Sequence, residues 1–470
     1  MPKTKIIATI GPASEKYDTI EKMILSGVSC FRFNTKHGEL AWHKKIMARV
    51  RHAAQKLNTN ISICLDLQGP EVRIGTIKNN ALELKNKDLV LFGEGKNKQY
   101  PLIPLQNQQV IKQIKSGNTI YLDDGFIELL VVKKYNKACL LRVIQGGMVK
   151  SNKSANFPDI ELDMPSLSEK DLTVLAIVEH LDIDWVALSF VREAKDLSIL
   201  KKLLAKKKIN AGVISKIETK KAVKNIEEII DASDAVMVAR GDLAVEFDYQ
   251  KVPYIQKEII ASCRIKAKPV IVATQMLLSM VQNPRPTRAE ISDVANAIYD
   301  STDALMLSEE SAAGKFPLKS VKTMAEIASF IESKKQKEYF RLEPHAMNEL
   351  VTKAAFDISQ SQYAAENDID KIVVLTETGL SARLLARFHP RGEIIAVSAS
   401  QKTVNRLLLS YAVLPVYRPF PKGRLHSSKW VIEKLKKLKI VKKGEKVLLI
   451  HGENWGNPGR TNTLRIQEVY

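Results

Sequence analysis

The chain has 470 residues, 45% of them hydrophobic and 26% charged, the balance of an ordinary globular protein of about three domains. It contains no run of eighteen apolar residues, so the sequence predicts no membrane span. The 72 basic residues exceed the 52 acidic ones and give a net charge of +20. They are spread along the chain, which favours attraction of small phosphorylated anions over a dedicated nucleic-acid-binding surface.

The N-terminal segment MPKTKIIATIGP passes from two lysines directly into a strand pattern. It lacks the apolar core and the small-residue cleavage site of a signal peptide, so we expect a cytoplasmic protein. The cysteines are widely separated, and they form neither a CxxC pair nor a set with histidines at metal-binding spacing. We expect buried thiols at all four positions, Cys30, Cys64, Cys139 and Cys263.

Strand-like apolar runs alternate with helical patterns through most of the first 334 residues. Apolar residues recur with helical spacing at 43–57 and 220–230, for example. Such alternation predicts a parallel sheet, and a count of eight strands predicts an α/β fold closed into a (β/α)8 barrel, formed by residues 1–74 and 157–334. The predicted strands are 5–10, 28–34, 61–66, 184–189, 211–217, 235–240, 269–274 and 304–308.

Two further domains are predicted outside the barrel. Residues 75–156 contain short alternating runs broken by Gly and Asn, which is typical of a small all-β domain. We expect a small β-barrel inserted in a barrel loop, where it could act as a lid. After a charged linker, strand and helix patterns alternate again through residues 346–470 and predict a doubly wound α/β domain.

Two of the predicted barrel strands end abruptly in charge. Lys216 and Glu218 are two residues apart in VISKIE, so an extended strand projects both side chains to the same side. The other strand ends in Arg240, Gly241 and Asp242, within MVARGDL. Two carboxylates beside a fixed ammonium would suit a hard metal ion and phosphoryl transfer. For either run alone, a strand followed by a surface salt bridge is an equally good interpretation.

The carboxyl ends of the other strands are also polar. Active sites of (β/α)8 barrels are assembled from these positions, so the convergence of eight such ends favours a catalytic site. The residues concerned are Arg32, Asn34, Lys36, His37, Asp66, Gln68, Glu71, Arg73, Ser189, Arg192, Thr274, Gln275, Ser308 and Glu309.

An ordered set of motifs resembles the pyruvate kinase family over essentially the whole chain. The motifs are ATIGPAS, RFNTKHG, LDLQGPEVR, SKIET, MVARGDL, ATQML, PRPTRAEISDVANAIYD and MLSEES. The resemblance implies transfer of a phosphoryl group from phosphoenolpyruvate to ADP, giving pyruvate and ATP in the last step of glycolysis. It also implies a homotetramer that uses Mg²⁺ or Mn²⁺.

Two alternatives to this function remain open from the sequence. One is another barrel enzyme that uses phosphoenolpyruvate or pyruvate, and the inserted β-domain together with the ATQM and PRPTRAE motifs argues against it. The other is a basic nucleic-acid-binding protein on a degenerate kinase scaffold. That function would need a clustered basic face, whereas the basic residues are dispersed.

The resemblance assigns roles to the residues at the strand ends. Glu218 and Asp242 would hold Mg²⁺, and Lys216 would neutralise the transferring phosphoryl group and the enolate left behind. Phosphate groups would contact Arg32. The expected nucleotide-binding residues are Arg73, Lys153, Asn34 and His37.

The substrate carboxylate is expected beside the backbone amides of Arg240, Gly241 and Asp242. Thr274 stands where the family protonates the enolate, and the resemblance leaves open whether the proton comes from its hydroxyl or from water.

The resemblance also implies a K⁺ site made by Asn34, Asp66 and the Leu67 carbonyl. Lys36 stands where the family has a serine in this site, and the segment DLQGPE mixes features of K⁺-dependent and K⁺-independent members. We hypothesise that the Lys36 ammonium replaces K⁺, paired with Asp66 or Glu71, since both cations are compact single charges. In the alternative, Lys36 points to solvent and K⁺ still binds.

The segment TETGLSA in the C-terminal domain resembles the family's phosphate-binding effector loop. Its candidate effector residues are Thr376, Thr378, Gly379 and Ser381, although an ordinary capped helix would look the same. A sugar phosphate or a nucleotide is the expected effector. Glu377 argues against fructose 1,6-bisphosphate, because some members of the family have a lysine there that favours this sugar. Leu278, Glu309 and Ala244 are further departures from the family pattern, and the sequence does not indicate their effect.

Overall fold

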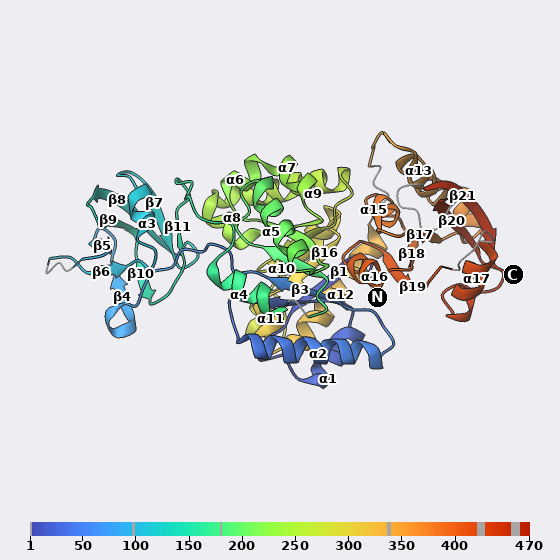
Figure 1. Ribbon diagram of the computed structural model, residues 1–470, viewed down its shortest axis with the longest axis horizontal. Coiled ribbons are helices and arrows are strands. Elements are labelled where there is room, and N and C mark those ends of the chain that lie inside the picture. Colours follow the sequence, from blue (N-terminus) through green and yellow to red (C-terminus); the bar gives the residue numbers. More distant parts are fainter. Residues whose placement is uncertain (1, 96–98, 179–180, 336–339, 421–427, 453–460) are drawn as a thin grey trace.

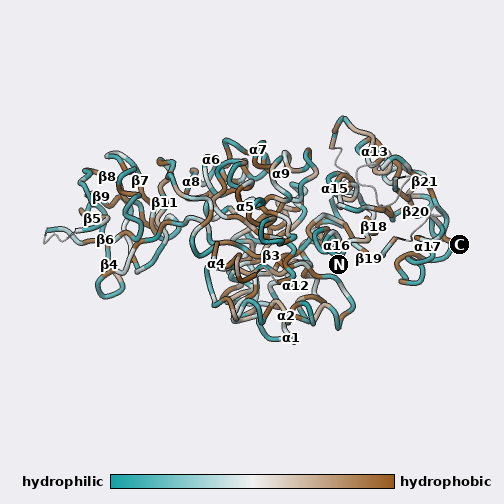
Figure 2. Tube along the Cα trace, viewed as in Figure 1, coloured by the Kyte–Doolittle hydropathy of each residue, from teal (hydrophilic) through white to brown (hydrophobic). Residues whose placement is uncertain are grey.

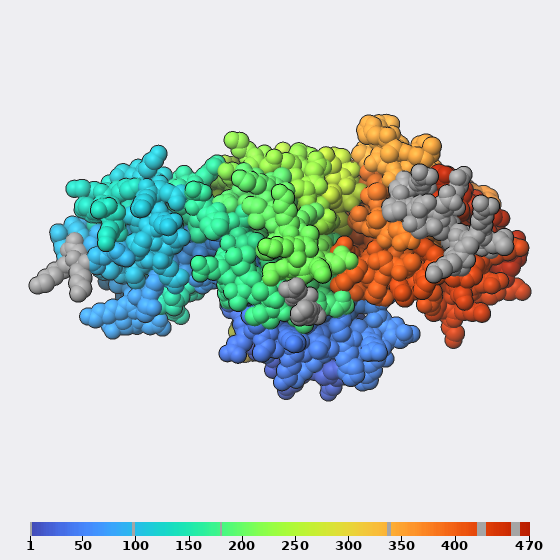
Figure 3. Space-filling model, in the orientation of Figure 1, coloured from blue at the N-terminus to red at the C-terminus, as the bar shows by residue number. Residues whose placement is uncertain are grey.

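A computed structural model describes residues 2–95, 99–178, 181–335, 340–420, 428–452 and 461–470. The molecule is elongated, with the barrel in the middle, the inserted β-rich part at one end and the C-terminal part at the other (Figure 1). The space-filling view shows the same three parts as successive lobes (Figure 3).

Eight parallel strands close into the barrel in the order β1-β16-β15-β14-β13-β12-β3-β2. Their side chains are almost all buried, as expected for parallel strands covered by helices, and brown hydrophobic segments gather in the middle of the molecule, around the label of β3, in Figure 2. The predicted fold class is confirmed. The strands are β1 (Lys5–Thr9), β2 (Val28–Asn34), β3 (Ser62–Asp66), β12 (Trp185–Leu188), β13 (Gly212–Ile217), β14 (Ala235–Ala239), β15 (Val270–Ala273) and β16 (Ala304–Leu307).

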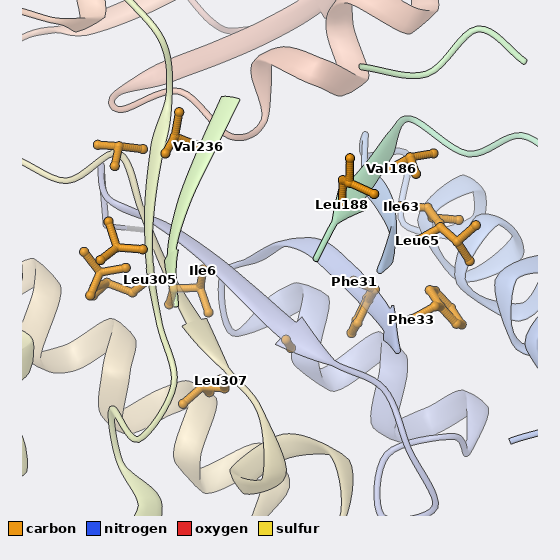
Figure 4. Close-up of a cluster of buried hydrophobic side chains, with 14 of the residues drawn as sticks. Ile6, Phe31, Phe33, Ile63, Leu65, Val186, Leu188, Val236, Leu305 and Leu307 are labelled. Carbon is orange, nitrogen blue, oxygen red and sulfur yellow. The ribbon is translucent and has the colours of Figure 1, made fainter. Parts of the chain in front are cut away.

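Helices surround the barrel and bury one apolar face each against it. In Figure 4, Ile63 and Leu65 of β3 lie beside Val186 and Leu188 of β12, within the cluster between strands and helices. The helices are α1 (Tyr17–Leu25), α2 (Leu40–Lys56), α4 (Glu169–Ile177), α5 (Ala194–Lys206), α6 (Lys220–Lys224), α7 (Ile226–Ala232), α8 (Arg240–Glu246), α9 (Val252–Ile265), α10 (Arg288–Tyr299), α11 (Glu309–Ala312) and α12 (Pro317–Lys334).

The insertion between β3 and β12 is β-rich and has its own hydrophobic core. Its strands form an open six-stranded sheet, β11-β7-β8-β9-β5-β6, and a separate ladder of β10 and β4, where the sequence suggested closure into a small barrel. The elements are β4 (Ala81–Leu84), β5 (Leu89–Gly93), β6 (Leu102–Pro104), α3 (Gln109–Gln113), β7 (Thr119–Leu122), β8 (Ile127–Lys134), β9 (Ala138–Gln145), β10 (Gly147–Lys150) and β11 (Ala155–Asn156).

The C-terminal part has a five-stranded sheet in the order β19-β18-β17-β20-β21, with apolar clusters on its two faces. Only β21 is antiparallel to its neighbour. The elements are α13 (Met347–Ser359), α14 (Gln362–Glu366), β17 (Lys371–Leu375), α15 (Leu380–Ala386), β18 (Glu393–Ser398), α16 (Gln401–Leu407), β19 (Val413–Tyr417), α17 (Ser428–Lys437), β20 (Lys446–Gly452) and β21 (Thr461–Glu468).

The C-terminal part covers the floor of the barrel, meaning the end formed by the amino ends of the strands. Leu409 joins the apolar cluster inside the barrel. Three aspartates that immediately precede strands also build the floor, because each carboxylate accepts a backbone N–H from the neighbouring strand. The pairs are Asp184 with Ile63 at 2.9 Å, Asp234 with Val213 at 2.8 Å and Asp303 with Val270 at 3.0 Å.

Among the described residues, the structure has no helix with the combined length and apolarity that a membrane span requires.

Candidate active site

The mouth of the barrel, formed by the carboxyl ends of its strands, holds a buried network of charges. Lys216 Nζ lies 2.8 Å from Glu218 Oε1 and 3.5 Å from Asp66 Oδ1. Arg32 Nε donates to the other Asp66 oxygen at 2.6 Å. Strands β2, β3 and β13 therefore bring together four residues that the sequence placed at three different strand ends.

Each charge in this network depends on its neighbours. Burial disfavours the Lys216 ammonium, but Asp66 and Glu218 outweigh it and hold the pKa of Lys216 above its usual value. Burial likewise works against the Asp66 carboxylate, and the Lys216 and Arg32 cations bring the pKa of Asp66 below its ordinary range. Both groups are therefore charged at neutral pH.

Asp242 lies in the first turn of α8, beside this network. Burial and the negative charge of Glu218 raise the pKa of Asp242 to about 7. Within the described part of the chain, its carboxylate accepts no hydrogen bond. A divalent cation would relieve this repulsion, and carboxylate oxygens are the ligands that Mg²⁺ prefers.

The two carboxylates are a small ligand set. The described residues contain no group of three or more His, Cys, Asp or Glu side chains arranged to hold a metal ion. Mg²⁺ usually keeps several waters and binds through one or two carboxylates plus substrate phosphates. Glu218 and Asp242 fit that pattern, with the other ligand positions left to water and substrate.

Backbone strain positions Glu218 through residues that the sequence analysis did not single out. The Phe190 N–H donates to Glu218 Oε2 at 2.6 Å, and Phe190 has a positive φ of 55°. A Cβ on Gly69 would come within 2.8 Å of the Ser189 Cβ, so only glycine permits this approach. Strain of this kind is common at functional sites. No sequence signal marked Phe190 or Gly69, because their roles arise from contact between two loops.

Ser189 joins Lys216 to the loop after β3. Its hydroxyl accepts a hydrogen bond from Lys216 Nζ at 2.7 Å and donates to the Leu67 carbonyl at 2.8 Å. The carbonyl predicted for the K⁺ site thus already accepts one hydrogen bond. Asn34, the other polar residue predicted there, accepts from the backbone N–H of Lys36 at 3.1 Å.

Lys36 pairs with Glu71, one of the two partners that the sequence analysis considered. Its ammonium lies 3.2 Å from Glu71 Oε2 and 5.7 Å from the centre of the Phe190 ring. Arg73 contacts the same Glu71 oxygen at 3.0 Å, so this carboxylate lies between two cations. Arg73 also donates to the Asn152 carbonyl at 2.7 Å, which links the barrel to the insertion.

A hydrogen bond joins Thr274, at the end of β15, to Gly241, at the end of β14. The Gly241 N–H donates to Thr274 Oγ1 at 2.9 Å, and the Thr274 hydroxyl donates to the Ala273 carbonyl at 2.6 Å. Thr274 has a positive φ of 72°, unusual for a β-branched residue. The Arg240 guanidinium turns away to Asp293 at 2.6 Å. Of the amides expected beside the substrate carboxylate, that of Gly241 is engaged by Thr274.

The remaining predicted nucleotide ligands lie at the lid side of the mouth. Lys153 Nζ pairs with Asp123 Oδ1 at 2.6 Å, on the turn between β7 and β8. That turn reaches the barrel, since a Cβ on Gly125 would lie 3.4 Å from the Val245 side chain of α8. Desolvation and the nearby Arg73 and Lys36 cations lower the pKa of His37 below its usual value, which favours the neutral imidazole.

A cleft of about 930 Å³ opens between the barrel mouth and the insertion. Glu71 and Asp242 line it at the mouth, and residues 154–167 line it along the hinge. Its size suits a small-molecule site. On the hinge side, Lys220 Nζ donates to the Pro158 carbonyl at 3.2 Å, and Lys221 pairs with Glu161 at 3.0 Å.

The four predicted effector residues lie together in the C-terminal part, away from the mouth. The Gly379 N–H donates to Thr376 Oγ1 at 2.9 Å, and Gly379 has a φ of 82°. The Ser381 hydroxyl lies 2.6 Å from that of Thr461, and the Thr378 carbonyl accepts from Arg383 at 3.1 Å. The loop is thus ordered by its own hydrogen bonds.

The three departures from the family pattern have exposed side chains, Leu278, Glu309 and Ala244. None of them takes part in the charge network described above.

Two family models match the chain. The model described as pyruvate kinase, barrel domain, matches residues 1–321, and the one described as pyruvate kinase, alpha/beta domain, matches residues 357–467. A pyruvate kinase of Thermococcus litoralis is 40% identical over 479 residues, which cover 99% of this chain and 98% of the relative. A pyruvate kinase of Clostridium acetobutylicum is 38% identical, with 100% of both chains covered. One from Staphylococcus aureus is 37% identical, covering 100% of this chain and 81% of its own.

Proposed function

Since the chain belongs to the pyruvate kinase family of phosphotransferases, we propose that it transfers the phosphoryl group of phosphoenolpyruvate to ADP and releases pyruvate and ATP. The observation that carries this proposal is the buried Lys216 ammonium, 2.8 Å from Glu218 and 3.5 Å from Asp66. Phosphoryl transfer requires little covalent work from the protein, so fixed charges around the moving group can supply most of the catalysis.

In this proposal Glu218 and Asp242 hold Mg²⁺, or Mn²⁺ in its place. When bound, the ion supplies charge neutralisation for the phosphoryl and enolate oxygens. Lys216 neutralises the transferring phosphoryl group and the enolate oxygen that remains. Its fixed position, hydrogen-bonded to Ser189 at 2.7 Å, means that the charge needs no rearrangement during the reaction.

The substrates are proposed to lie on two sides of this centre. Arg32 binds phosphate oxygens of phosphoenolpyruvate, and the amides at the start of α8 approach its carboxylate. ADP binds toward the lid, near the residues that are expected to contact the nucleotide, which are Arg73, Lys153, Asn34 and His37. Thr274 lies beside Gly241 at 2.9 Å, and the enolate carbon takes its proton on that side, either from the hydroxyl or from water.

We also propose that the Lys36 ammonium replaces the K⁺ ion of the family. The support is its distance of 3.2 Å from Glu71 and its place over the Phe190 ring. Phe190 in turn donates its N–H to Glu218. A covalently attached cation at this position would keep the local charge balance without a bound ion.

We propose a separate role for each of the three parts of the chain. Residues 1–74 and 157–334 form the catalytic barrel, residues 75–156 act as a lid, and residues 346–470 serve regulation and assembly of a homotetramer. A phosphorylated effector, either a sugar phosphate or a nucleotide, would bind at the Thr376–Ser381 loop.

Pyruvate formation from phosphoenolpyruvate and ADP tests the central proposal. We expect turnover with Mg²⁺ and its loss when EDTA removes the ion. Absence of pyruvate with Mg²⁺, in buffers with K⁺ and without it, would contradict the proposed function.

The K⁺ proposal has a separate test in a Lys36→Ser variant. We expect the wild type to turn over equally in K⁺ and in K⁺-free sodium buffer, and the variant to lose on the order of tenfold or more without K⁺ and to recover with it. Lys170→Ser is the matched control. Lys170 donates to the Lys36 carbonyl at 3.3 Å, so this change removes a neighbouring lysine while the Lys36 ammonium stays in place. A variant with no new K⁺ dependence would argue against the replacement.

A further inference from the structure

A small cavity lies between the barrel floor and the C-terminal part, far from the mouth. Its volume is about 10 Å³, which is room for a single water-sized particle. Four cations and one carboxylate are among the residues that line it, namely Arg264, Lys268, Arg383, Arg387 and Asp303, together with Ser410. Among the residues that line the cavity, cations therefore outnumber carboxylates by four to one.

Two buried donors that line this cavity have no partner in the described structure. Arg387 is 3% exposed, and its Nη1 donates to the Ile265 carbonyl at 3.2 Å and lies 3.6 Å from Glu349. Its Nε and Nη2 atoms make no hydrogen bond, and neither does the hydroxyl of Ser410, which is 1% exposed. Buried polar atoms without partners are rare and costly, so an acceptor is expected between them.

Both oxygens of the Asp303 carboxylate, which lies in the cavity wall, already accept backbone hydrogen bonds. Asp303 Oδ1 accepts from the Tyr411 N–H at 2.9 Å, and Oδ2 accepts from the Val270 N–H at 3.0 Å. Burial lowers the pKa of Lys268, Arg383 and Arg387 below their usual values, since removal from water disfavours the charged forms.

We propose that the cavity binds a small inorganic anion of halide size, chloride in ordinary solution, held by Arg387 Nε and Nη2 and by the Ser410 hydroxyl. A water molecule could accept from these donors but would leave the positive excess in place. A tetrahedral phosphate group is a cluster of five heavy atoms, whereas the cavity has room for a single water-sized particle.

The two residues that would hold the anion lie in the C-terminal part, and the Lys268 side chain lines the barrel side of the same cavity. Arg387 follows α15, Ser410 lies between α16 and β19, and Lys268 precedes β15 of the barrel. Binding of the anion would therefore stabilise the contact between the barrel and the C-terminal part. The inference is independent of the proposed function, because none of these residues lies at the barrel mouth.

A crystal of the full chain grown in sodium bromide tests the site directly. Bromide replaces chloride and gives an anomalous signal at its absorption edge. We expect a peak in the cavity within hydrogen-bond distance of Arg387 and Ser410. Density without an anomalous signal would identify a water molecule and overturn the proposal.

Thermal unfolding provides the solution test. At constant ionic strength, replacing sodium gluconate with sodium chloride should raise the Tm of the wild type by about 1–3 °C. The shift should disappear in Arg387→Met and shrink in Ser410→Ala, which removes a donor with little change in volume. Arg341→Met, at an exposed arginine outside the cavity, is the charge-matched control and should keep the full shift.

If Arg387→Met does not fold, the Ser410→Ala variant and the bromide crystal of the wild type still decide the question. An anomalous peak without a chloride-specific Tm shift would mean binding at crystal concentration only, which also overturns the proposal.

Discussion

The mouth and the floor of the barrel both carry carboxylates at strand ends, but they satisfy them in different ways. At the floor, Asp184, Asp234 and Asp303 each accept a backbone N–H from the neighbouring strand at 2.8 to 3.0 Å. At the mouth, Glu218 also accepts one backbone N–H, that of Phe190, but it lies 2.8 Å from Lys216, and burial together with the charge of Glu218 raises the pKa of Asp242 to about 7.

This difference separates stability from chemistry in one fold. A carboxylate that accepts backbone hydrogen bonds fixes the register of strands and the docking of the C-terminal part. Two neighbouring carboxylates that repel each other, as Glu218 and Asp242 do at the mouth, cost stability, and a bound cation or a proton relieves the repulsion. We therefore propose that the floor serves the stability of the fold and that the mouth performs phosphoryl transfer.

The largest expected effect of any single change is at Lys216. In Lys216→Met, kcat for pyruvate formation should fall by on the order of 10³-fold, because a fixed cation beside the transferring group is lost. Steady-state kinetics at saturating Mg²⁺ would measure this. Lys170→Met, which removes an exposed lysine near the mouth, is the control. A loss smaller than about tenfold would show that Lys216 is not the central charge.

The next largest loss of activity is expected from a change of packing at the mouth. In Gly69→Ala, the new Cβ would lie 2.8 Å from the Ser189 Cβ and 3.1 Å from the Phe190 ring. We expect kcat/KM to fall by about 10² fold, because displacement of Phe190 misplaces Glu218. Gly125→Ala is the matched control, since Gly125 also has a positive φ but has ordinary contact with Val245 at 3.4 Å. Equal losses of kcat/KM in the two variants would show that backbone strain at a positive φ causes the loss, and not the contact of the new Cβ with Ser189 and Phe190.

At the floor, the expected effect is on stability and depends on pH. Burial raises the pKa of Asp303 from 3.8 to about 6. The folded state therefore binds more protons than the unfolded state between these values, so this group makes the protein less stable as pH rises from about 4 to 6. The free energy of unfolding of the wild type, minus that of Asp303→Asn, should fall over this interval by about 3 kcal/mol at most.

Urea unfolding of both proteins at several pH values would measure this difference, and the subtraction cancels the titration of all other groups. A difference that is flat from pH 4 to 6, or that rises, would contradict the assignment to Asp303.

The smallest expected effect is at Asn405, which makes one hydrogen bond across the floor and accepts another from Gln401, within α16, at 2.9 Å. Asn405 Nδ2 donates to Asp184 Oδ1 at 3.0 Å. In Asn405→Ala, the free energy of unfolding should fall by about 1 kcal/mol, while kcat remains within experimental error of the wild type. Gln362→Ala, which removes an exposed amide that bonds along α14 to Glu366 at 2.7 Å, should change neither quantity measurably. A loss of kcat in Asn405→Ala would mean that the floor is coupled to the mouth.

The sequence was sufficient for the barrel because apolar runs of strand length recur eight times with helices between them. It was less informative where polar and apolar residues mix. The predicted helix at 220–230 is two helices that meet at Asn225, whose side chain donates to the Arg192 carbonyl at 3.0 Å. The antiparallel strand β21 was not predicted, since TNTLRIQE has no continuous apolar run.

At the site, sequence reasoning could name charged residues but not the contacts that hold them. Lys216 and Glu218 follow from two-residue spacing on a strand. The roles of Phe190 and Gly69 follow only from the close approach of two loops, 2.8 Å at the nearest contact of an added Cβ. The floor aspartates had a signal that went unused, an Asp directly before three strands in DWVAL, DAVMV and DALML.

The most direct test of the contrast between the two barrel ends is kcat for pyruvate formation in Glu218→Gln and Asp303→Asn, measured side by side with saturating phosphoenolpyruvate, ADP and Mg²⁺. Both changes replace a buried carboxylate with its amide. We predict a loss of on the order of 10² fold or more in Glu218→Gln and a kcat within about twofold of the wild type in Asp303→Asn. Comparable losses in the two variants, or a fully active Glu218→Gln enzyme, would contradict the assignment of chemistry to the mouth and of stability to the floor.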